Sequence, residues 1–571
     1  MNFLWKIGGE AGFGIVTTGS LFSKIAAKSG YYIFDFIQYP SLIRGGHNSF
    51  EALVSDKEVS NTKKTIDFLV CLNKETLDLH KKRLTSSTYI IYDKDEFQVD
   101  GDYIKIMVPF SEILKRLNGQ SIMKNTIALG ASLAILGGEL EILDEMLEKQ
   151  FSDKTKEIIQ YNQKFAEEGF NYVKTNYKDK IKQYLVKKEA QDKLILTAND
   201  AFSLASVYAD CKFYSAYPMT PSSSVLSTLA SWQEKTSIVV RHAEDEIAAV
   251  NNVIGASFMG VRSSTGTSGG GFALMVESIS YAGVAEIPLV IFLSQRPGPA
   301  TGMPTWTEQG DLLFTVNAGH GEFPKIVLAP GDQEEMTELT IKAYNLADIY
   351  QTPVIVMSDM FLSEAHKSID LQKIKKVLID NKIQRGTTIN NLNEEKYLRY
   401  KLTDDGISPR LIPGKSDIYY QANSYEHLED GHSTEDNEMR KKQVDKRNKK
   451  IITYLNNDFK GPNIYGDLDN AEIVLVGWGS TKGPMIEAIK QITSKKKISV
   501  IHFSHVYPLN KEKVVTNFKE GKRYILVENN SQGQFGKLLL QETGIEIKEK
   551  LLKYDGRMFY TEEIINYLLT S

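Results

Sequence analysis

Cysteine is almost missing from this chain: only Cys71 and Cys211 occur among its 571 residues. No CxxC pair is present, so the chain cannot by itself hold an iron–sulfur cluster through four thiolates. Two distant cysteines also exclude a disulfide framework, as expected in a reducing compartment. Both stand in apolar, strand-like runs, and we predict that they are small buried core residues.

Long hydrophobic runs and an excess of one charge are missing as well. The longest apolar runs, such as 127–136, are far too short to span a membrane. The strand-like residues 3–7 follow Met1 directly, a pattern unlike a signal peptide. A formal net charge of −4, with 25% charged residues, argues against nucleic-acid binding. We therefore predict a cytoplasmic globular protein without a nucleic-acid or membrane partner.

The chain is too long for a single core, and its pattern predicts several α/β domains. Strand-like runs alternate with helical periodicity in 1–190, in 193–370 and again in 466–571. The block 371–465 is different because it is dense in charge and interrupted by glycine and proline. We predict that this block is a linking extension, and that its charged run 435–450 is a solvated helix.

Two glycine-rich segments lead from a strand into a helix. Residues 8–14 could cradle a pyrophosphate, because glycines let backbone N–H groups approach its oxygens. Their spacing fits the dinucleotide pattern poorly, Asp35 supplies the expected acid only loosely, and a structural turn is an equal alternative. The segment 264–272 lacks the ending of a triphosphate-binding loop. We predict that its residues Gly269 and Gly270 approach a cofactor or a partner chain closely.

Polar residues follow two of the predicted strands, at the edge where open α/β sheets bind ligands. Thr220 lies in the Tyr-Pro-Met-Thr-Pro segment 217–221. Glu246 opens a helix after the strand 238–240, and a buried glutamate there can hydrogen-bond or protonate a ring nitrogen. A thiamin cofactor requires that task of its protein. Glu244, two residues earlier, is an alternative for the same role.

An arginine opens the irregular segment 296–305, which follows another apolar strand. The Arg296 guanidinium at a strand end is well suited to bind a carboxylate in a bidentate manner. Thr301 and Thr305 add two hydroxyl groups to the same segment. The alternative is a structural ion pair between Arg296 and a carboxylate such as Glu308.

A metal-binding motif for the cofactor diphosphate is missing. Thiamin diphosphate is normally held through Mg²⁺ by Gly-Asp-Gly and an asparagine some thirty residues later, and the nearest segments, 310–312 and 466–468, lack that pattern. The metal and diphosphate half of the site must therefore come from another polypeptide. We assign no metal role to His427 or His432 and predict that they pack at the polar surface.

Taken in order, these motifs resemble the alpha subunit of 2-oxoacid:ferredoxin oxidoreductases, in the form with a gamma-type domain fused ahead of alpha. The motifs are 8–14, 41–48, 217–221, the helix from Glu246, 296–305, 409–414 and 527–534. The resemblance implies a gamma-like domain at 1–190 and a pyrimidine-binding domain of a thiamin diphosphate enzyme at 193–370. It also implies a transketolase-type C-terminal domain at 466–571.

The resemblance also implies roles for individual residues. Thr220 corresponds to the threonine that contacts the bound 2-oxoacid, and Glu246 to the glutamate that hydrogen-bonds the aminopyrimidine ring. Arg296 corresponds to the arginine that faces the substrate carboxylate, with Thr301 and Thr305 lining the same pocket. Glu246 is preferred to Glu244 because small residues follow it, as in the family's helix.

By the same resemblance, thiamin diphosphate is shared with a beta subunit that carries Mg²⁺ and a [4Fe–4S] cluster. Coenzyme A accepts the acyl group, ferredoxin accepts the electrons, and the assembly is αβ or (αβ)₂. The fused layout favours 2-oxoglutarate as the substrate, while pyruvate and other 2-oxoacids are alternatives. A non-catalytic regulatory paralogue and a nucleotide-dependent dehydrogenase are rivals of other classes, the latter disfavoured by the spacing of the first glycines.

Overall fold

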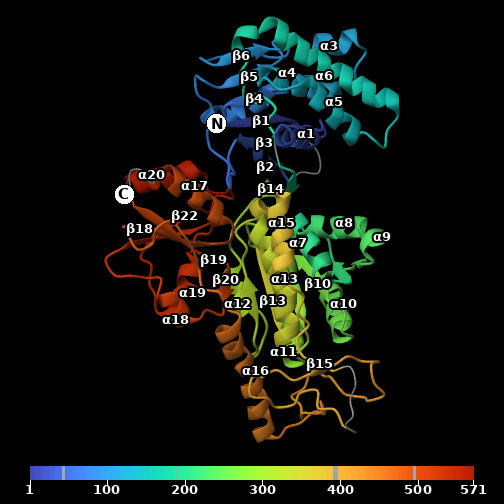
Figure 1. Cartoon of the computed structure of the whole chain (residues 1–571), viewed down its shortest axis with the longest axis vertical. Coiled ribbons are helices and arrows are strands. Elements are labelled where there is room, and N and C mark those ends of the chain that lie inside the picture. The colour runs from blue at the N-terminus through green and yellow to red at the C-terminus, as the bar shows by residue number, and fades with distance from the viewer. Residues whose placement is uncertain (42–45, 190, 390–395, 493–496, 571) are drawn as a thin grey trace. The chain divides into compact units, whose positions relative to one another are not determined.

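The computed structural model divides into two compact units, coloured by residue number in Figure 1. It describes residues 1–41, 46–189, 191–389, 396–492 and 497–570. Unit 1 consists of 1–196, 364–372 and 560–566. Unit 2 consists of 197–363, 373–559 and the residues from 567. Of the predicted motif 41–48, residues 42–45 lie outside the described part of the chain.

Unit 1 is built on an eight-stranded sheet within its described residues, in the order β6-β5-β4-β1-β3-β2-β14-β7. Its strands are β1 (Asn2–Glu10), β2 (Tyr32–Gln38), β3 (His47–Ser55), β4 (Phe68–Cys71), β5 (Tyr89–Tyr92), β6 (Ile104–Met107), β7 (Lys193–Leu196) and β14 (His366–Asp370). The central strand β1 pairs in parallel with β4 and antiparallel with β3. Apolar residues on β1 are buried, and the Trp5 ring stacks on Phe22 of the first helix at 4.0 Å between centroids.

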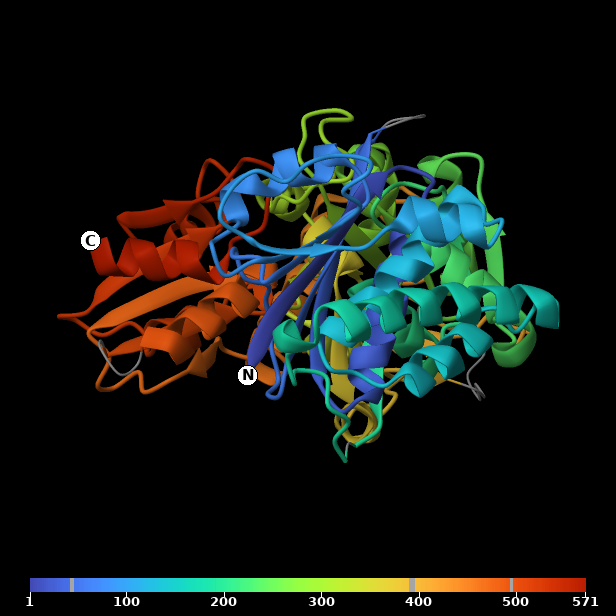
Figure 2. The same ribbon diagram turned by 90° about the horizontal axis from the view of Figure 1, so that it is seen from above.

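Helices pack together as a second layer of unit 1 (Figure 2). They are α1 (Ile15–Lys28), α4 (Lys124–Ile135), α5 (Leu140–Gln150) and α6 (Lys156–Asn176), with the shorter α3 (Phe110–Arg116). The short helix α2 (Lys74–His80) packs instead against β1, β3 and β4. A Cβ at Gly130 of α4 would lie 1.9 Å from the carbonyl oxygen of Ala166 on α6. The two helices therefore cross at a distance that only glycine allows.

The strands at both ends of the block predicted as 193–370 belong to the sheet of unit 1. β14 pairs antiparallel with β7 over 367–370 and with β2, where His366 faces Asp35. The imidazole Nδ1 of His366 also lies 2.7 Å from the Asp35 carboxylate. The chain therefore leaves unit 1 after β7 and returns to its sheet through β14, a pairing that local periodicity does not reveal.

The first sheet of unit 2 has seven strands among the described residues, in the order β20-β12-β13-β11-β10-β8-β9. They are β8 (Phe213–Ala216), β9 (Val239–His242), β10 (Ser263–Thr267), β11 (Leu289–Gln295), β12 (Ile326–Leu328), β13 (Pro353–Asp359) and β20 (His505–Tyr507). The helices α7 (Ala198–Tyr208), α8 (Ser223–Ser231), α10 (Glu246–Phe258), α11 (Gly269–Val284) and α13 (Gln333–Tyr350) connect or cover these strands. Because β12, β13, β11, β10, β8 and β9 run in parallel, their carboxyl ends share one edge.

A second sheet in unit 2 has five strands within the described part, in the order β17-β19-β18-β21-β22. They are β17 (Asn463–Tyr465), β18 (Ile473–Trp478), β19 (Ile498–Phe503), β21 (Arg523–Glu528) and β22 (Glu549–Leu552), with α17 (Lys482–Ile492) and α19 (Gln534–Thr543) beside them. β20 leaves this part of the chain and pairs antiparallel with β12 of the first sheet. This pairing joins the C-terminal α/β region to the core of unit 2.

The helix predicted to be solvated is α16 (Asn437–Asn457), and the prediction is wrong for one of its faces. Lys446 and Lys450 are buried and lie 2.6 and 2.5 Å from the carboxylate of Glu286. Burial alone would raise the pKa of Glu286, but the two ammonium groups outweigh it and hold the pKa below its ordinary value. Charges this deeply buried require such partners, so the extension packs firmly on the core.

Other predictions for single residues have mixed outcomes. Cys71 and Cys211 are buried, as predicted. His432 is exposed, but the prediction of a surface position is wrong for His427, which is fully buried with its ring 3.8 Å from that of Tyr400. The Tyr400 ring, which is distant from His427 in sequence, covers the imidazole and shields it from solvent.

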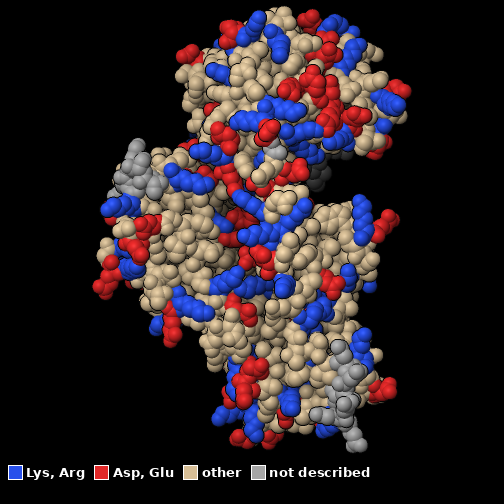
Figure 3. Space-filling model, in the orientation of Figure 1, with Lys and Arg blue, Asp and Glu red and all other residues tan. Residues whose placement is uncertain are grey.

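The distribution of charge on the surface and the polarity of the helices agree with the nearly balanced charge and the short apolar runs of the sequence. On the face shown in Figure 3, basic and acidic side chains are interspersed. Among the residues that the structure describes, no helix combines the length and the apolar character needed to cross a membrane.

Candidate functional site

Four segments with the predicted site residues follow neighbouring parallel strands of unit 2. Thr220 follows β8, Glu246 follows β9, Gly269 follows β10 and Arg296 follows β11. These strands are adjacent in the sheet, so the fold gathers the four segments along one edge. This is the edge at which parallel α/β sheets bind ligands.

Glu246 is the first residue of α10, and its side chain is buried with 3% exposure. Asp245 caps the helix by accepting a hydrogen bond from the Ala248 N–H at 2.7 Å. A Cβ at Gly271 would lie 2.4 Å from Glu246 Oε1, so glycine leaves the room that this carboxyl occupies. Burial raises the pKa of Glu246. Glu244, by contrast, is exposed.

Arg296 is held beside Thr220. The Arg296 Nη1 donates a hydrogen bond to the backbone carbonyl of Thr220 at 2.8 Å. Burial lowers the pKa of Arg296, and Asp311 opposes this effect. Arg296 forms no ion pair with the residues that the structure describes, so the alternative of a pair with Glu308 is not found there. Its remaining N–H groups can bind an anion.

The two threonines of the segment 296–305 occupy different surroundings. Thr305 is buried, and its hydroxyl has no hydrogen-bond partner among the described residues. Thr301 is exposed, next to Gly302 with φ at +53°. A Cβ at Gly302 would lie 1.8 Å from the Pro297 carbonyl oxygen, so the turn requires glycine. The segment thus presents Thr305 to the interior and Thr301 to its exposed turn.

Two carboxyl groups follow the segment of Arg296 in the chain: Glu308, considered above as a structural partner of Arg296, and Asp311, to which the sequence assigned no role. Burial raises the pKa of Asp311 to about 6, although Arg296 acts to lower it. Burial and the charge of Asp311 together raise the pKa of Glu308 to about 7. The sequence signal at Asp311 was Gly310-Asp311, a near match to the metal motif. Its actual surroundings depend on residues far away in the chain.

Several buried polar atoms in these segments lack hydrogen-bond partners among the described residues and could bind the polar ring of a cofactor. Within the described part of the chain, Glu246 Oε1, Ser268 Oγ, Thr305 Oγ1 and Asp311 Oδ2 have no hydrogen-bond partner. Such orphaned groups are costly unless a ligand or water satisfies them. Gly269 and Gly270 begin α11, and a Cβ at Gly270 would meet no atom within 4 Å. The described residues contain no cluster of three or more His, Cys, Asp or Glu side chains suited to a metal.

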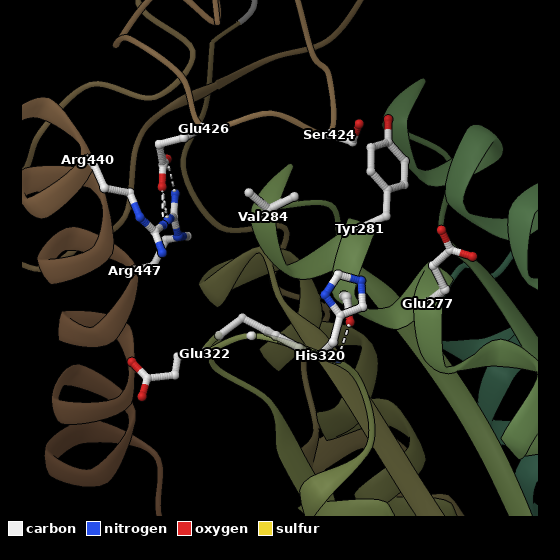
Figure 4. Close-up of a pocket in the computed structure, with 12 residues that line it drawn as sticks. Glu277, Tyr281, Val284, His320, Glu322, Ser424, Glu426, Arg440 and Arg447 are labelled. Carbon is white, nitrogen blue, oxygen red and sulfur yellow. Dashed lines mark hydrogen bonds and ion pairs between the residues drawn. The ribbon is translucent and has the colours of Figure 1, made fainter. Parts of the chain in front are cut away.

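A separate cavity of about 480 Å³ lies beside the C-terminal half of α11 (Figure 4). It is lined by side chains including Glu277, Tyr281 and His320. On its opposite wall, Glu426 accepts two hydrogen bonds from Arg447, at 2.9 and 2.8 Å, and also contacts Arg440. None of the predicted site residues lines this cavity. The residues predicted to bind substrate and cofactor therefore lie at the strand edge and not at this cavity.

Comparison with known proteins places these features in a family. Residues 204–446 match the family model described as pyruvate flavodoxin/ferredoxin oxidoreductase, thiamine diphosphate-binding, and residues 4–172 match pyruvate ferredoxin/flavodoxin oxidoreductase. The 2-oxoacid:ferredoxin oxidoreductase alpha subunit of Sulfolobus sp. is 32% identical over 100% of this chain and 97% of its own. That of Saccharolobus solfataricus is 33% identical over 99% and 97%.

A solved structure agrees over the whole length. The 2-oxoglutarate:ferredoxin oxidoreductase from Magnetococcus marinus, with 2-oxoglutarate, coenzyme A and succinyl-CoA bound, matches with a TM-score of 0.91. It is 29% identical, and the match covers 100% of this chain and 99% of that chain.

The fold and the matched domain define a thiamin diphosphate-dependent oxidoreductase subunit with several α/β domains. The chain belongs to the family of 2-oxoacid:ferredoxin oxidoreductase alpha subunits. The predicted fold class, family and thiamin diphosphate-binding domain are thereby confirmed. The relatives are named as alpha subunits, which implies further subunits.

Proposed function

We propose that this chain, together with a beta subunit, catalyses the coenzyme A-dependent oxidative decarboxylation of a 2-oxoacid, with 2-oxoglutarate as the favoured substrate. The products are an acyl-CoA, CO₂ and electrons delivered to ferredoxin. The observation that carries the proposal is Arg296, which Thr220 orients and which lacks an ion-pair partner among the described residues. The Magnetococcus marinus relative binds 2-oxoglutarate, which supports that substrate over pyruvate.

Each site residue has a defined task in this proposal. Arg296 holds the substrate carboxylate by charge-assisted hydrogen bonds, and Thr220 and Thr305 offer hydroxyl groups to the same substrate. Glu246 exchanges a proton or hydrogen bond with a ring nitrogen of the cofactor. Thiamin diphosphate, when bound, stabilises the negative charge that decarboxylation leaves behind. Gly269 and Gly270 let it approach the backbone at the start of α11.

The remaining cofactors are proposed to lie on the beta subunit. Cys71 is buried in unit 1 and Cys211 is buried in unit 2, so the two thiols do not form a pair of ligands within either unit. A [4Fe–4S] cluster requires four such ligands, and with Mg²⁺ it is assigned to beta. An αβ or (αβ)₂ assembly then brings the two halves of the site together.

We expect the assembled complex to reduce a viologen dye with 2-oxoglutarate, in a reaction that requires coenzyme A and thiamin diphosphate. The measurement is anaerobic dye reduction across a panel of 2-oxoacids. Reduction with pyruvate in place of 2-oxoglutarate would change the substrate assignment. A stable complex with an intact cluster that turns over no 2-oxoacid would instead support a regulatory paralogue.

Replacing Arg296 with Met is expected to raise KM for the 2-oxoacid by about 10- to 100-fold, because a charged hydrogen bond contributes roughly 1.5–3 kcal/mol. The same dye assay measures KM and kcat separately. Arg116→Met, at an exposed arginine of unit 1, is the matched control and should leave KM unchanged. An unchanged KM in Arg296→Met would remove this residue from the substrate site.

A further inference from the structure

The segment that carries Arg296 and Thr305 is an Ω-loop, a compact loop whose two ends lie close together. It covers residues 296–310 and begins directly after β11. The side chain of Gln295 closes its neck, because Gln295 Oε1 accepts a hydrogen bond from the Asp311 N–H at 3.0 Å. Gln295 Nε2 donates to a backbone carbonyl of β13 at 3.1 Å, so the neck is also fixed to the sheet.

The returning arm of this loop is held by side-chain amides from the C-terminal part of unit 2. Gln534 Nε2 donates to the Gly310 carbonyl at 2.6 Å, and Gln534 Oε1 accepts from the Leu313 N–H at 2.9 Å. Asn530 Nδ2 donates to the Gln309 carbonyl at 3.1 Å. A single glutamine therefore holds the backbone on both sides of the residue that closes the neck.

Gln309 ties the same arm to the second sheet of unit 2. Its Nε2 donates to the carbonyl of Trp478, at the end of β18, at 2.8 Å. The backbone N–H of Gln309 donates to the Asn529 carbonyl at 2.7 Å, and the Asn529 N–H donates back to Gln309 Oε1 at 3.0 Å. The Gln309 side chain is buried, so a displaced arm would leave these polar groups without water as a substitute.

Gln534 is itself held in place by the turn that precedes it. It is the first residue of α19, and Asn530 Oδ1 accepts hydrogen bonds from two N–H groups of that turn at 3.0 and 2.8 Å. Asn530 Nδ2 also lies 2.6 Å from the buried Glu528 carboxylate, to which it donates. The motif 527–534 contributed to the family resemblance without an assigned role. In the structure it presents Gln534 to the loop in a fixed position.

Thr305 is the side chain whose position this network sets. The two residues after it are both anchored: the Arg557 guanidinium lies 3.1 Å from the centroid of the Trp306 ring, and Thr307 Oγ1 donates to Asp359 at 2.9 Å. Thr305 is 6% exposed, and its hydroxyl has no hydrogen-bond partner among the described residues. A buried hydroxyl fixed in this way is suited to bind a ligand or a water molecule.

We propose that Gln534 is a positioning residue for the 2-oxoacid. By holding the returning arm of the Ω-loop, it sets the place of the Thr305 hydroxyl and thereby the affinity for the substrate. This inference rests on the proposed function, in which Thr305 offers its hydroxyl to the 2-oxoacid. A loop held in its binding conformation before the substrate arrives loses less entropy on binding.

The first test is Gln534→Leu in the assembled complex, assayed by anaerobic dye reduction with 2-oxoglutarate. Leucine has a similar size but can form neither hydrogen bond, so KM should rise by about 5- to 10-fold. The value of kcat should change by no more than about 2-fold, because Glu246 lies on a different helix. Gln541→Leu, at an exposed position of α19, is the matched control and should change neither value. An unchanged KM in Gln534→Leu, or a fall in kcat alone, overturns the proposal.

A double-variant cycle separates the positioning of Thr305 from a general loosening of the chain. Thr305→Val alone should lower kcat/KM by about 5- to 10-fold, since it removes one hydrogen bond to the substrate. Adding Gln534→Leu to Thr305→Val should lower kcat/KM by less than about 2-fold more, because the hydroxyl that Gln534 positions is already missing. Two losses that combine in full would show that Gln534 does not act through Thr305.

The same assays separate this inference from the proposed function. If Arg296→Met and Thr305→Val both leave kcat/KM unchanged, the proposed substrate site fails and this inference fails with it. If Arg296→Met is impaired while Thr305→Val is not, the substrate site stands and only the role of Gln534 fails. If Gln534→Leu does not assemble with the beta subunit, Gln534→Met takes its place with the same expected result.

Discussion

Replacing Glu246 with Gln is expected to abolish 2-oxoacid decarboxylation by the assembled complex, with a loss in kcat of about 100-fold or more. Gln has nearly the same shape, so the space opposite Gly271 stays filled. Asp245 caps α10 independently of residue 246, so the helix should still begin at the same residue. What is lost is a carboxyl that can carry a proton to and from a cofactor nitrogen.

The stability of this variant should be unchanged or slightly higher. Burial raises the pKa of the Glu246 carboxyl in the folded state above its ordinary value of 4.5. As the pH rises, this carboxyl therefore ionises at a lower pH in the unfolded chain than in the folded one. Ionisation of the buried group therefore costs stability at neutral pH, and Gln removes that cost. Dye reduction and thermal unfolding of the same samples measure both quantities. A fall in melting temperature that parallels the loss of activity would contradict a catalytic role.

Glu244→Gln is the control for this experiment. Glu244 is exposed, and an exposed substitution should change kcat by no more than about 2-fold. Retained activity in Glu246→Gln, combined with a loss in Glu244→Gln, would assign the cofactor contact to Glu244.

Removing the charge of Glu286 is expected to destabilise the chain strongly. Glu286→Gln leaves Lys446 and Lys450 buried without their counter-charge, and breaking a buried ion pair costs about 3–5 kcal/mol. The measurement is the urea midpoint and the melting temperature of the chain. Glu277→Gln, at an exposed carboxylate on α11, is the control and should change neither by much.

The effect of Glu286→Gln should depend on pH with a defined sign. The folded-state pKa of Glu286 is lowered, so its contribution is present above the unfolded-state value of 4.5 and is lost as the pH falls below it. The difference in stability between the two proteins should therefore shrink in acid. A difference that stays constant with pH would mean that the carboxylate charge is not its cause.

A double substitution sharpens this experiment. Adding Lys450→Met to Glu286→Gln removes one of the two uncompensated cations and replaces it with an apolar chain of similar length. The double variant should recover part of the lost stability, since apolar replacements of buried ion pairs are often neutral. A further loss would show that Lys450 contributes through other contacts, such as its 3.2 Å hydrogen bond to the Gln351 carbonyl.

Part of the candidate site could be predicted from local sequence because local rules determine it. Glu246 follows a short strand and opens a helix whose cap is its neighbour Asp245, so its place at the strand edge was predictable. Arg296 likewise directly follows β11. The glycines at the start of α11 also lie where a strand ends and a helix begins. These positions depend on contacts within a few residues.

Other features could not be read from the same patterns. Glu286 and Lys446 meet across 160 positions, so a charge-dense run that is typical of a solvated helix became partly buried. His427 is buried because Tyr400 covers it, which its polar neighbours in sequence did not indicate. The place of β7 and β14 in the sheet of unit 1 likewise depends on pairing between distant segments.

Motif order and strand ends are local properties, so the amino-acid sequence was enough to predict the family, the α/β class and the candidates Thr220, Glu246 and Arg296. The burial of Glu246, the exposure of Glu244 and the contact between Arg296 and Thr220 became visible only in the folded chain. The same holds for Asp311, which lies beside Gly269 in a segment that Gln534 holds from more than 200 positions away. Burial and charge pairing depend on which distant segments meet, and packing decides that.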